Sequence, residues 1–190
     1  MQDKISKILQ SSIDIKREIL TNYNLLNQIE QVVALTTVCF KNGGKVLTCG
    51  NGGSAADAQH LSAELSGRFY KDRNPLFAEA LHVNTSYLTA VANDYSFDEV
   101  YARLVKAKGK NGDILWGFST SGNSENILRA FIQAKASDMI TIGFTGESGG
   151  KLASLCDILI NVPSTDTPRI QECHIVIGHI ICELIEDNLF

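Results

Sequence analysis

Four side chains of the metal-binding and acid–base type lie in two stretches with helical periodicity. His60 and Glu64 are four residues apart in the segment Ala55–Ser66, so they share one face of a helix. Gln171 and His179 are eight residues apart near the C-terminus, which is about 80° around a helix, so they can share a broad face. Two histidines, a carboxylate and an amide oxygen are suitable ligands for zinc or a similar ion. Spacing alone leaves an ordinary helix-surface contact open as the alternative.

A hydroxyl-rich loop offers a different kind of chemistry. Phe118 is followed by Ser119-Thr120-Ser121-Gly122-Asn123-Ser124 and then by a helical pattern. Hydroxyl donors beside the free N–H groups of a helix N-terminus, where the helix dipole is positive, suit a phosphate without any lysine. The alternative is an ordinary N-cap, with Ser121 or Ser124 capping the helix 124–135. Four clustered hydroxyls favour the anion site.

Two further loops are rich in glycine. The first, Gly50-Asn51-Gly52-Gly53-Ser54, lacks both the G-x-G-x-x-G spacing of dinucleotide-binding proteins and a Walker A lysine. Its glycines fit a tight strand-to-helix turn or a close approach of the backbone to a polyhydroxy ligand, and both interpretations stay open. The second loop, Thr145-Gly146-Glu147-Ser148-Gly149-Gly150, follows Phe144.

The elements that must position these groups alternate along the chain. Short, nearly continuous apolar runs predict strands buried on both faces of a parallel sheet. These runs are Lys45–Cys49, Ala78–Val83, Asp113–Phe118, Met139–Phe144 and Asp157–Val162. Helical patterns occupy Ala55–Ser66, Tyr87–Val91, Phe97–Lys106, Ser124–Lys135, Lys151–Leu155 and about Arg169–Asn188. The alternation predicts a doubly wound α/β fold, in which ligands bind beyond the carboxyl ends of the strands.

The N-terminal residues do not belong to the minimal α/β pattern. Residues 1–40 predict amphipathic helices with an apolar face. Together with the apolar face of the last helix, they indicate packing against another subunit. We therefore expect a single domain over residues 1–190, with residues 1–40 used for oligomerisation and residues 41–190 forming the α/β core and C-terminal helix.

Composition narrows the class of protein. The chain has 190 residues, 44% of them hydrophobic and 20% charged, with a net charge of −4 and no basic run, which argues against nucleic-acid binding. The five cysteines form no CxxC pair and lie mostly in apolar runs, as expected of reduced, buried thiols in a cytosolic protein. The N-terminus does not read as a signal peptide, and no apolar stretch approaches the ~20 residues of a membrane span. We expect a soluble, cytoplasmic protein.

Five sequence blocks, in order, resemble the phosphoheptose isomerases of the sugar-isomerase (SIS) domain superfamily. The blocks are CGNGGSAADAQHLSAEL, VANDYSFDEVYA, FSTSGNSENILRA, GFTGESGGKLA and VPSTDTPRIQECHIVIGHIICELIE. The resemblance implies a five-stranded parallel sheet flanked by helices, and a homotetramer with active sites at subunit interfaces. It also implies interconversion of sedoheptulose 7-phosphate and D-glycero-D-manno-heptose 7-phosphate through an enediol, for lipopolysaccharide or capsule assembly.

The resemblance assigns roles position by position. One zinc ion per subunit would be held by His60, Glu64, Gln171 and His179, with Glu64 as base and His179 as acid. The hydroxyl-rich loop would anchor the phosphate, and no nucleotide cofactor takes part. The substrate contacts would come from Asn51, Gly52, Gly53, Ser54, Glu64, Asn93, Asp94, Ser119, Thr120, Ser121, Ser124 and Gln171.

One segment departs from the pattern of the family. Some relatives carry an acidic residue directly before Arg-Ile-Gln-Glu, where this chain has Pro168, and Asp166 lies two residues earlier. The contacts of this segment are left open. The remaining histidines, His82 and His174, gain no role from the resemblance and are interpreted as structural. The arginines Arg68 and Arg169 could each supply positive charge to the site or form an ordinary salt bridge.

Three rival functions remain at this stage. The first is a non-catalytic relative that associates with the bacterial replication initiator; that subfamily lacks the glutamate and late histidine matching Glu64 and His179, whose presence favours the enzyme. The second is a sugar-sensing regulatory domain, although no helix-turn-helix segment or basic patch is attached. The third is an isomerase of another phosphosugar, which would change the substrate but not the reaction class.

Overall fold

The computed structural model describes the whole chain, from Met1 to Phe190. Its centre is a five-stranded sheet in which all neighbours are parallel. The strand order is β2 (Ala78–Ala80), β1 (Val46–Gly50), β3 (Ile114–Phe118), β4 (Ile140–Thr145) and β5 (Ile158–Asn161). Because parallel neighbours need crossover connections, the helices must cover both faces of this sheet. The predicted fold class is confirmed.

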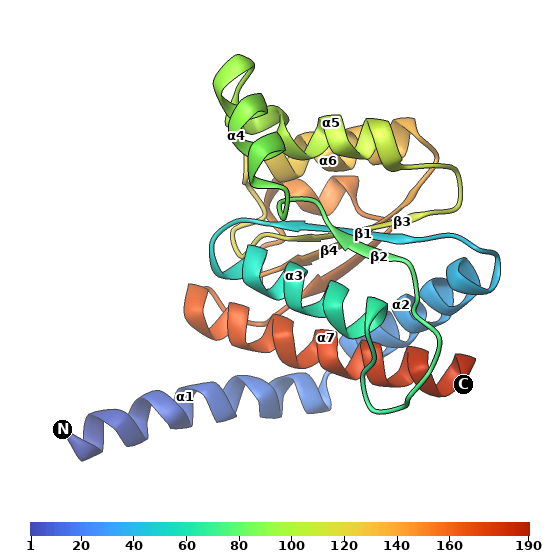
Figure 1. Cartoon of the computed structure of the whole chain (residues 1–190). Coiled ribbons are helices and arrows are strands. Elements are labelled where there is room, and N and C mark those ends of the chain that lie inside the picture. The colour runs from blue at the N-terminus through green and yellow to red at the C-terminus, as the bar shows by residue number, and fades with distance from the viewer.

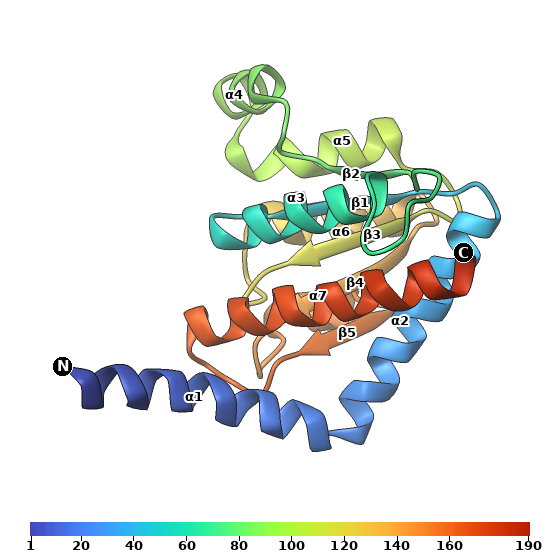
Figure 2. The ribbon, with the colours of Figure 1, turned by 60° about the horizontal axis from the view of Figure 1, so that its bottom comes forward.

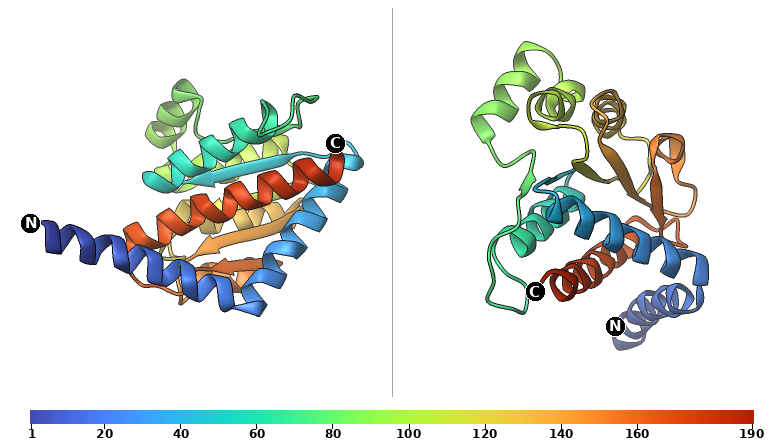
Figure 3. Two further views of the ribbon diagram at one scale, coloured as in Figure 1. Left: turned by 90° about the horizontal axis from the view of Figure 1, so that it is seen from below. Right: turned by 90° about the vertical axis from the view of Figure 1, so that its right-hand side faces the viewer.

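Two layers of helices enclose the sheet (Figures 1 and 3). One face is covered by α2 (Tyr23–Lys41), α3 (Gly53–Ser66) and α7 (Thr167–Leu189). The other face is covered by α5 (Val100–Lys108), α6 (Glu125–Ala136) and the 3₁₀ helix η2 (Gly150–Leu155). Each layer has its own apolar core, so the strands are buried from both sides.

The central strands show why their sequences are continuously apolar. In β3, Trp116 and Phe118 belong to the core beneath α2, α3 and α7, whereas Leu115 belongs to the core beneath α5 and α6. In β1, Val46 belongs to the core beneath α2, α3 and α7, and Leu47 belongs to the core beneath α5 and α6. Successive side chains of a strand point to opposite faces, so a strand covered on both faces needs apolar residues at nearly every position.

The two N-terminal helices differ in their burial. Asn22 separates α1 (Gln2–Thr21) from α2, and its side chain accepts a hydrogen bond from the backbone N–H of Leu25 at 3.1 Å. Helix α2 is part of the core, whereas α1 buries no residue at all and extends from the body as an arm (Figure 2). Within residues 1–40, the apolar face of α1 is therefore the less covered one, because Ile15 and Ile19 pack against the core but Ile5, Ile8, Leu9 and Ile13 stay exposed.

Some predicted bounds shift in the structure. Strand β2 ends at Ala80 rather than Val83, because the chain turns and Asn84 caps α4 (Thr85–Asp94) by accepting from the N–H of Tyr87 at 3.0 Å. The predicted helix 97–106 is divided into a 3₁₀ turn, η1 (Phe97–Glu99), and α5. The short helical pattern before β5 forms a 3₁₀ helix.

The cysteines and helix lengths agree with the analysis of the sequence. All five thiols are free, and four are buried, with Cys156 partly exposed. No helix has both the length and the apolar character that crossing a membrane requires.

Candidate active site

Helices α3 and α7 lie side by side on one face of the sheet, and their line of contact carries most of the predicted chemistry (Figure 1). Gly178 of α7 allows the close approach. A Cβ atom placed there would lie only 2.3 Å from Cδ1 of Leu61 in α3. We call this line of contact the α3–α7 seam. It brings the residue after Gly178, His179, against the middle of α3.

Three of the four predicted metal ligands meet on the seam. Nε2 of His60 lies 3.2 Å from Oε1 of Glu64 and 3.0 Å from Nε2 of His179. One ligand atom from each of the three residues lies within 4.8 Å of the other two. The His60 side chain is 50% exposed, so the cluster is open to a small molecule. Two imidazole nitrogens and a carboxylate oxygen at this spacing can hold a divalent ion or exchange protons with a bound substrate.

Gln171 lies on the same seam, closer to the N-termini of both helices. Its Nε2 donates to Oδ1 of Asp57 at 2.5 Å, and its Cγ would be 3.5 Å from a Cβ at Gly53. Because the amide nitrogen is engaged by Asp57, the amide oxygen is the atom that remains to accept a hydrogen bond or to act as a ligand.

Asp57 is a site residue that the sequence analysis missed. It is buried, and its Oδ2 has no hydrogen-bond partner. Burial raises the pKa of Asp57 to about 6, although the hydrogen bond from Gln171 and the nearby His60 lower it. The signal was available, because Asp57 is three residues before His60 and therefore on the same helix face.

A polar cavity of about 270 Å³ opens beside Gln171. It includes five predicted substrate contacts and adds Thr167 and Pro168 from the first turn of α7. The full lining consists of Asn51, Gly53, Ser54, Thr120, Thr167, Pro168 and Gln171. In the segment before Arg169, Pro168 forms part of the cavity wall and also lines, together with Asp166, a second groove against α1.

The hydroxyl-rich loop is not arranged as an ordinary N-cap. Ser124 occupies the N-cap position of α6, but its side chain makes no capping hydrogen bond. Its Oγ lies 3.2 Å from Oγ of the buried Ser119 instead, and Oγ of Ser121 accepts from the N–H of Asn123. The N–H groups of the first turn of α6 therefore have no side-chain cap, as an anion site at a helix N-terminus requires.

Asn51 is held by a residue outside the predicted set. Nδ2 of Asn51 donates to Oδ1 of Asn126 at 2.8 Å, and Nδ2 of Asn126 donates to Oδ1 of Asn51 at 2.9 Å. Asn126 is buried in the first turn of α6. This reciprocal amide pair ties the glycine loop after β1 to the helix that follows the hydroxyl-rich loop. Such a pair joins residues 75 positions apart and has no signature in the sequence.

Asn93 and Asp94 do not join the cluster within one chain. They end α4, where Nδ2 of Asn93 donates to Oδ1 of Asp94 at 2.9 Å. Helix α4 packs on η1 and α5, on the side of the sheet opposite to α3 and α7 (Figure 1).

The other histidines and arginines lie outside the cluster. His174 is fully buried, with Nε2 3.1 Å from the carbonyl oxygen of Thr145, and burial lowers its pKa to about 4. Arg169 forms an ion pair with Glu172 at 2.5 Å. Arg68 is exposed and makes no ion pair.

Comparison with known proteins places this fold and site in a defined class. Residues 10–146 match the family model described as the SIS domain, so the chain is a SIS-domain protein. It is 51% identical over 190 residues to the phosphoheptose isomerase of Aneurinibacillus thermoaerophilus, covering 100% of this chain and 96% of that one. It is 50% identical over 190 residues to the phosphoheptose isomerase of Clostridium acetobutylicum, covering 100% of this chain and 97% of that one.

Solved structures agree. The phosphoheptose isomerase of Neisseria gonorrhoeae superposes with a TM-score of 0.92 at 44% identity, covering 98% of both chains. The enzyme from Francisella tularensis gives a TM-score of 0.94 at 41% identity, again over 98% of both chains. The chain belongs to the phosphoheptose isomerases and is a sugar-phosphate isomerase, as its five sequence blocks indicated.

Proposed function

We propose that the protein interconverts sedoheptulose 7-phosphate and D-glycero-D-manno-heptose 7-phosphate at the α3–α7 seam. The observation that carries this proposal is that His60, Glu64 and His179 meet on the α3–α7 seam, the same seam on which Gln171 lines the polar cavity. A sugar held by the cavity and by the hydroxyl-rich loop can extend along the seam to the cluster. The product would enter lipopolysaccharide or capsule assembly in the cytoplasm.

Glu64 and His179 divide the proton transfers between them. Glu64 removes a proton from C1 of the ketose, and His179 donates a proton to the carbonyl oxygen at C2, which gives the enediol. Glu64 then returns its proton to C2 while His179 accepts the proton of the C1 hydroxyl, which gives the aldose. Positioned acid and base groups of this kind typically contribute about 10²–10⁴-fold to the rate.

The phosphate would be bound at the other end of the substrate. The side chains of Ser119, Thr120, Ser121 and Ser124, with the N–H groups of the first turn of α6, are the proposed donors. Asn51, Gly52, Gly53, Ser54 and Gln171 are proposed to bind the sugar hydroxyls. A helix N-terminus supports this assignment because its dipole and free N–H groups favour an anion.

Zinc is the proposed ion. The donor set fits, since two imidazole nitrogens and one carboxylate oxygen converge and the amide oxygen of Gln171 lies on the same seam. When bound, the ion supplies Lewis acidity that stabilises negative charge on the substrate oxygens. His60 would serve only as a ligand, whereas Glu64 and His179 would also move protons.

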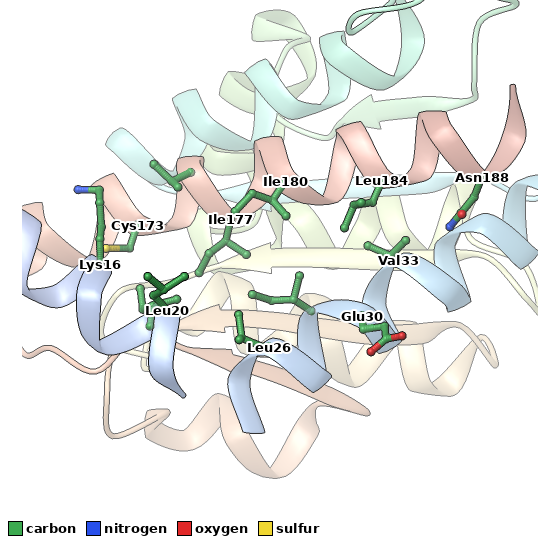
Figure 4. A pocket seen from close by; sticks show the side chains of 13 residues that line it. Lys16, Leu20, Leu26, Glu30, Val33, Cys173, Ile177, Ile180, Leu184 and Asn188 are labelled. Atoms are coloured by element: carbon green, nitrogen blue, oxygen red, sulfur yellow. The ribbon is translucent and has the colours of Figure 1, made fainter. Parts of the chain in front are cut away.

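We further propose a homotetramer with its active sites at subunit interfaces. An apolar groove of about 570 Å³ runs between α1, α2 and α7, and ten of its thirteen lining residues are hydrophobic (Figure 4). Ile180 and Leu184, one turn apart on α7, are each about two-fifths exposed along it. In such an assembly, Asn93 and Asp94 would reach the substrate from another subunit. Light scattering after size-exclusion chromatography tests the expected mass.

Turnover of sedoheptulose 7-phosphate, before and after chelation and zinc addition, tests the function directly. We expect wild-type activity that depends on the metal, and losses of at least 10²-fold in Glu64→Gln and His179→Gln. His82→Gln is the matched control, because it removes a histidine outside the cluster and should keep activity. A folded, metal-restored wild type without turnover would overturn the heptose assignment and direct the search to other phosphosugars.

A further inference from the structure

A buried ion pair lies at the end of the α3–α7 seam, beyond the catalytic cluster. The side chains of Arg73 and Glu186 are each 2% exposed, and Nε of Arg73 donates to Oε1 of Glu186 at 2.8 Å. Glu186 also accepts from three consecutive backbone N–H groups, those of Phe69, Tyr70 and Lys71, at 3.1, 2.8 and 2.7 Å. Burial alone would raise the pKa of Glu186, but these hydrogen bonds and Arg73 hold it below its usual range.

Arg73 uses the rest of its guanidinium group to cap α3. Nη2 donates to the carbonyl oxygen of Glu64 at 2.9 Å, and Nη1 donates to that of Leu65 at 2.9 Å. The last carbonyl oxygens of a helix have no partner within the helix, and a cation there also interacts favourably with the helix dipole. One side chain thus joins the C-terminal end of α3 to α7. We call this unit the Arg73–Glu186 clamp.

The clamp is connected to both residues that move protons. It binds the backbone of Glu64 itself on α3. On α7, Glu186 follows His179 by seven residues, which is about two turns and therefore the same face of the helix. The clamped loop also places the ring of Phe69 against that of His179, with centroids 5.7 Å apart.

We infer that the Arg73–Glu186 clamp is a positioning device that sets the separation and orientation of Glu64 and His179 for proton transfer. This inference rests on the isomerisation proposed for those two residues. The clamp itself touches no reacting atom. Its effect on rate comes from geometry, since a displacement of about 1 Å in a catalytic group can cost on the order of 10²-fold in turnover.

The test compares two buried ion pairs in the same protein. Glu186→Gln keeps the size of the side chain but removes the charge that holds Arg73 and the loop. Asp113→Asn is the matched control, because Asp113 pairs with the buried Lys45 at the amino ends of β1 and β3, away from the seam. Arg73→Lys is the conservative variant, since it keeps the positive charge but cannot cap several carbonyl oxygens at once.

Steady-state kinetics are measured at a temperature where circular dichroism shows every variant folded. We expect Glu186→Gln to lose about 10- to 100-fold in kcat with KM changed less than threefold. The kcat of Arg73→Lys should lie between those of Glu186→Gln and the wild type. Asp113→Asn should keep kcat within about twofold of the wild type, even if its Tm falls as far as that of Glu186→Gln. Equal kcat losses in Glu186→Gln and Asp113→Asn, or an unchanged kcat in Glu186→Gln, would overturn the inference.

Titration with Co²⁺ alone gives a readout that does not depend on turnover. We expect Glu186→Gln to bind Co²⁺ about tenfold more weakly than the wild type, because the clamp sets the distance between ligands on α3 and α7. Asp113→Asn should bind it as the wild type does. If the wild type proves inactive on the heptose phosphate while this difference persists, the proposed substrate is wrong and the clamp stands. Equal Co²⁺ affinity in the wild type, Glu186→Gln and Asp113→Asn would contradict the positioning role of the clamp.

Discussion

The two halves of the site are held in different ways. On the α3–α7 seam, the side chains of His60, Glu64 and His179 project from two helices that pack on the sheet, with Glu64 in the last turn of α3 and His179 near the middle of α7. At the carboxyl ends of the strands, the glycine loop and the hydroxyl-rich loop are shaped by backbone turns and by hydrogen bonds between loops. Helix packing therefore fixes the proposed catalytic groups, and loop backbone fixes most of the proposed binding groups, with Gln171 of α7 as an exception.

Because the two halves of the site are held differently, substitutions in them should change different kinetic constants. A change on the seam should lower kcat, because it moves groups that act only in the transition state. A change in the loops should raise KM, because it removes contacts that the bound substrate and the transition state share.

The largest effect on the loops is expected from Gly122→Ala. Gly122 has φ +64°, and a Cβ there would lie 2.1 Å from the carbonyl oxygen of Gly149 in the neighbouring loop. Left-handed backbone costs an alanine about 1–2 kcal/mol, and the clash with fixed backbone adds to this cost. We expect KM to rise at least tenfold while Co²⁺ affinity stays within about twofold of wild type.

The control for that substitution is Gly43→Ala. Gly43 has a similar φ of +74°, but a Cβ added there would have no other atom within 4 Å, and the residue precedes the amino end of β1. It should cost a comparable backbone strain without changing KM. If Gly122→Ala weakened Co²⁺ binding as much as substrate binding, the loops and the seam would not act as separate parts of the site.

The sequence predicts the seam better than it predicts how the seam is held. His60 and Glu64 could be paired from their spacing, because a helix fixes residues four apart on one face. The strands β1, β3, β4 and β5 could be found because burial on both faces leaves a continuous apolar run. The Arg73–Glu186 pair could not be found, because it joins residues 113 positions apart and one partner lies in a loop without periodicity.

The loops show the same limit. The cluster of hydroxyls could be interpreted as an anion site from composition and position. Whether Ser124 caps α6 could not be decided from the sequence, because a serine at an N-cap can turn its hydroxyl to the helix or to a neighbour such as Ser119. The partner of Asn51 was likewise hidden, since the pairing depends on how two crossover connections meet in space.

A smaller effect is expected from Asn126→Ala, which tests whether the two loops act as one binding unit. The substitution leaves the amide of Asn51 without its partner, and an unsatisfied polar group costs about 1–3 kcal/mol when buried. Because Asn51 is partly exposed, we expect a rise in KM of about three- to tenfold with kcat nearly unchanged. Gln133→Ala, in the same helix, is the matched control and should leave both constants unaltered. A fall in kcat alone would instead connect Asn126 to the seam.

The smallest effect on turnover is expected from the attachment of the seam to the sheet, which changes stability with pH instead. His174 anchors α7 to the carbonyl oxygen of Thr145 in β4, and burial lowers its pKa from 6.5 to about 4. As the pH falls below 6.5, the unfolded chain binds a proton that the folded protein does not. Stability is therefore lost progressively until the pH reaches the folded pKa, by up to about 3 kcal/mol.

Urea unfolding of the wild type and of His174→Gln between about pH 7.5 and 4 measures this contribution, because every other titrating group is common to both proteins. The unfolding free energy of the wild type should fall more steeply than that of the variant as the pH is lowered. A difference between the two proteins that is constant with pH would mean that His174 has the same pKa in the folded and unfolded chains. In that case α7 would be held to the sheet by apolar packing, without a contribution from a neutral, buried imidazole.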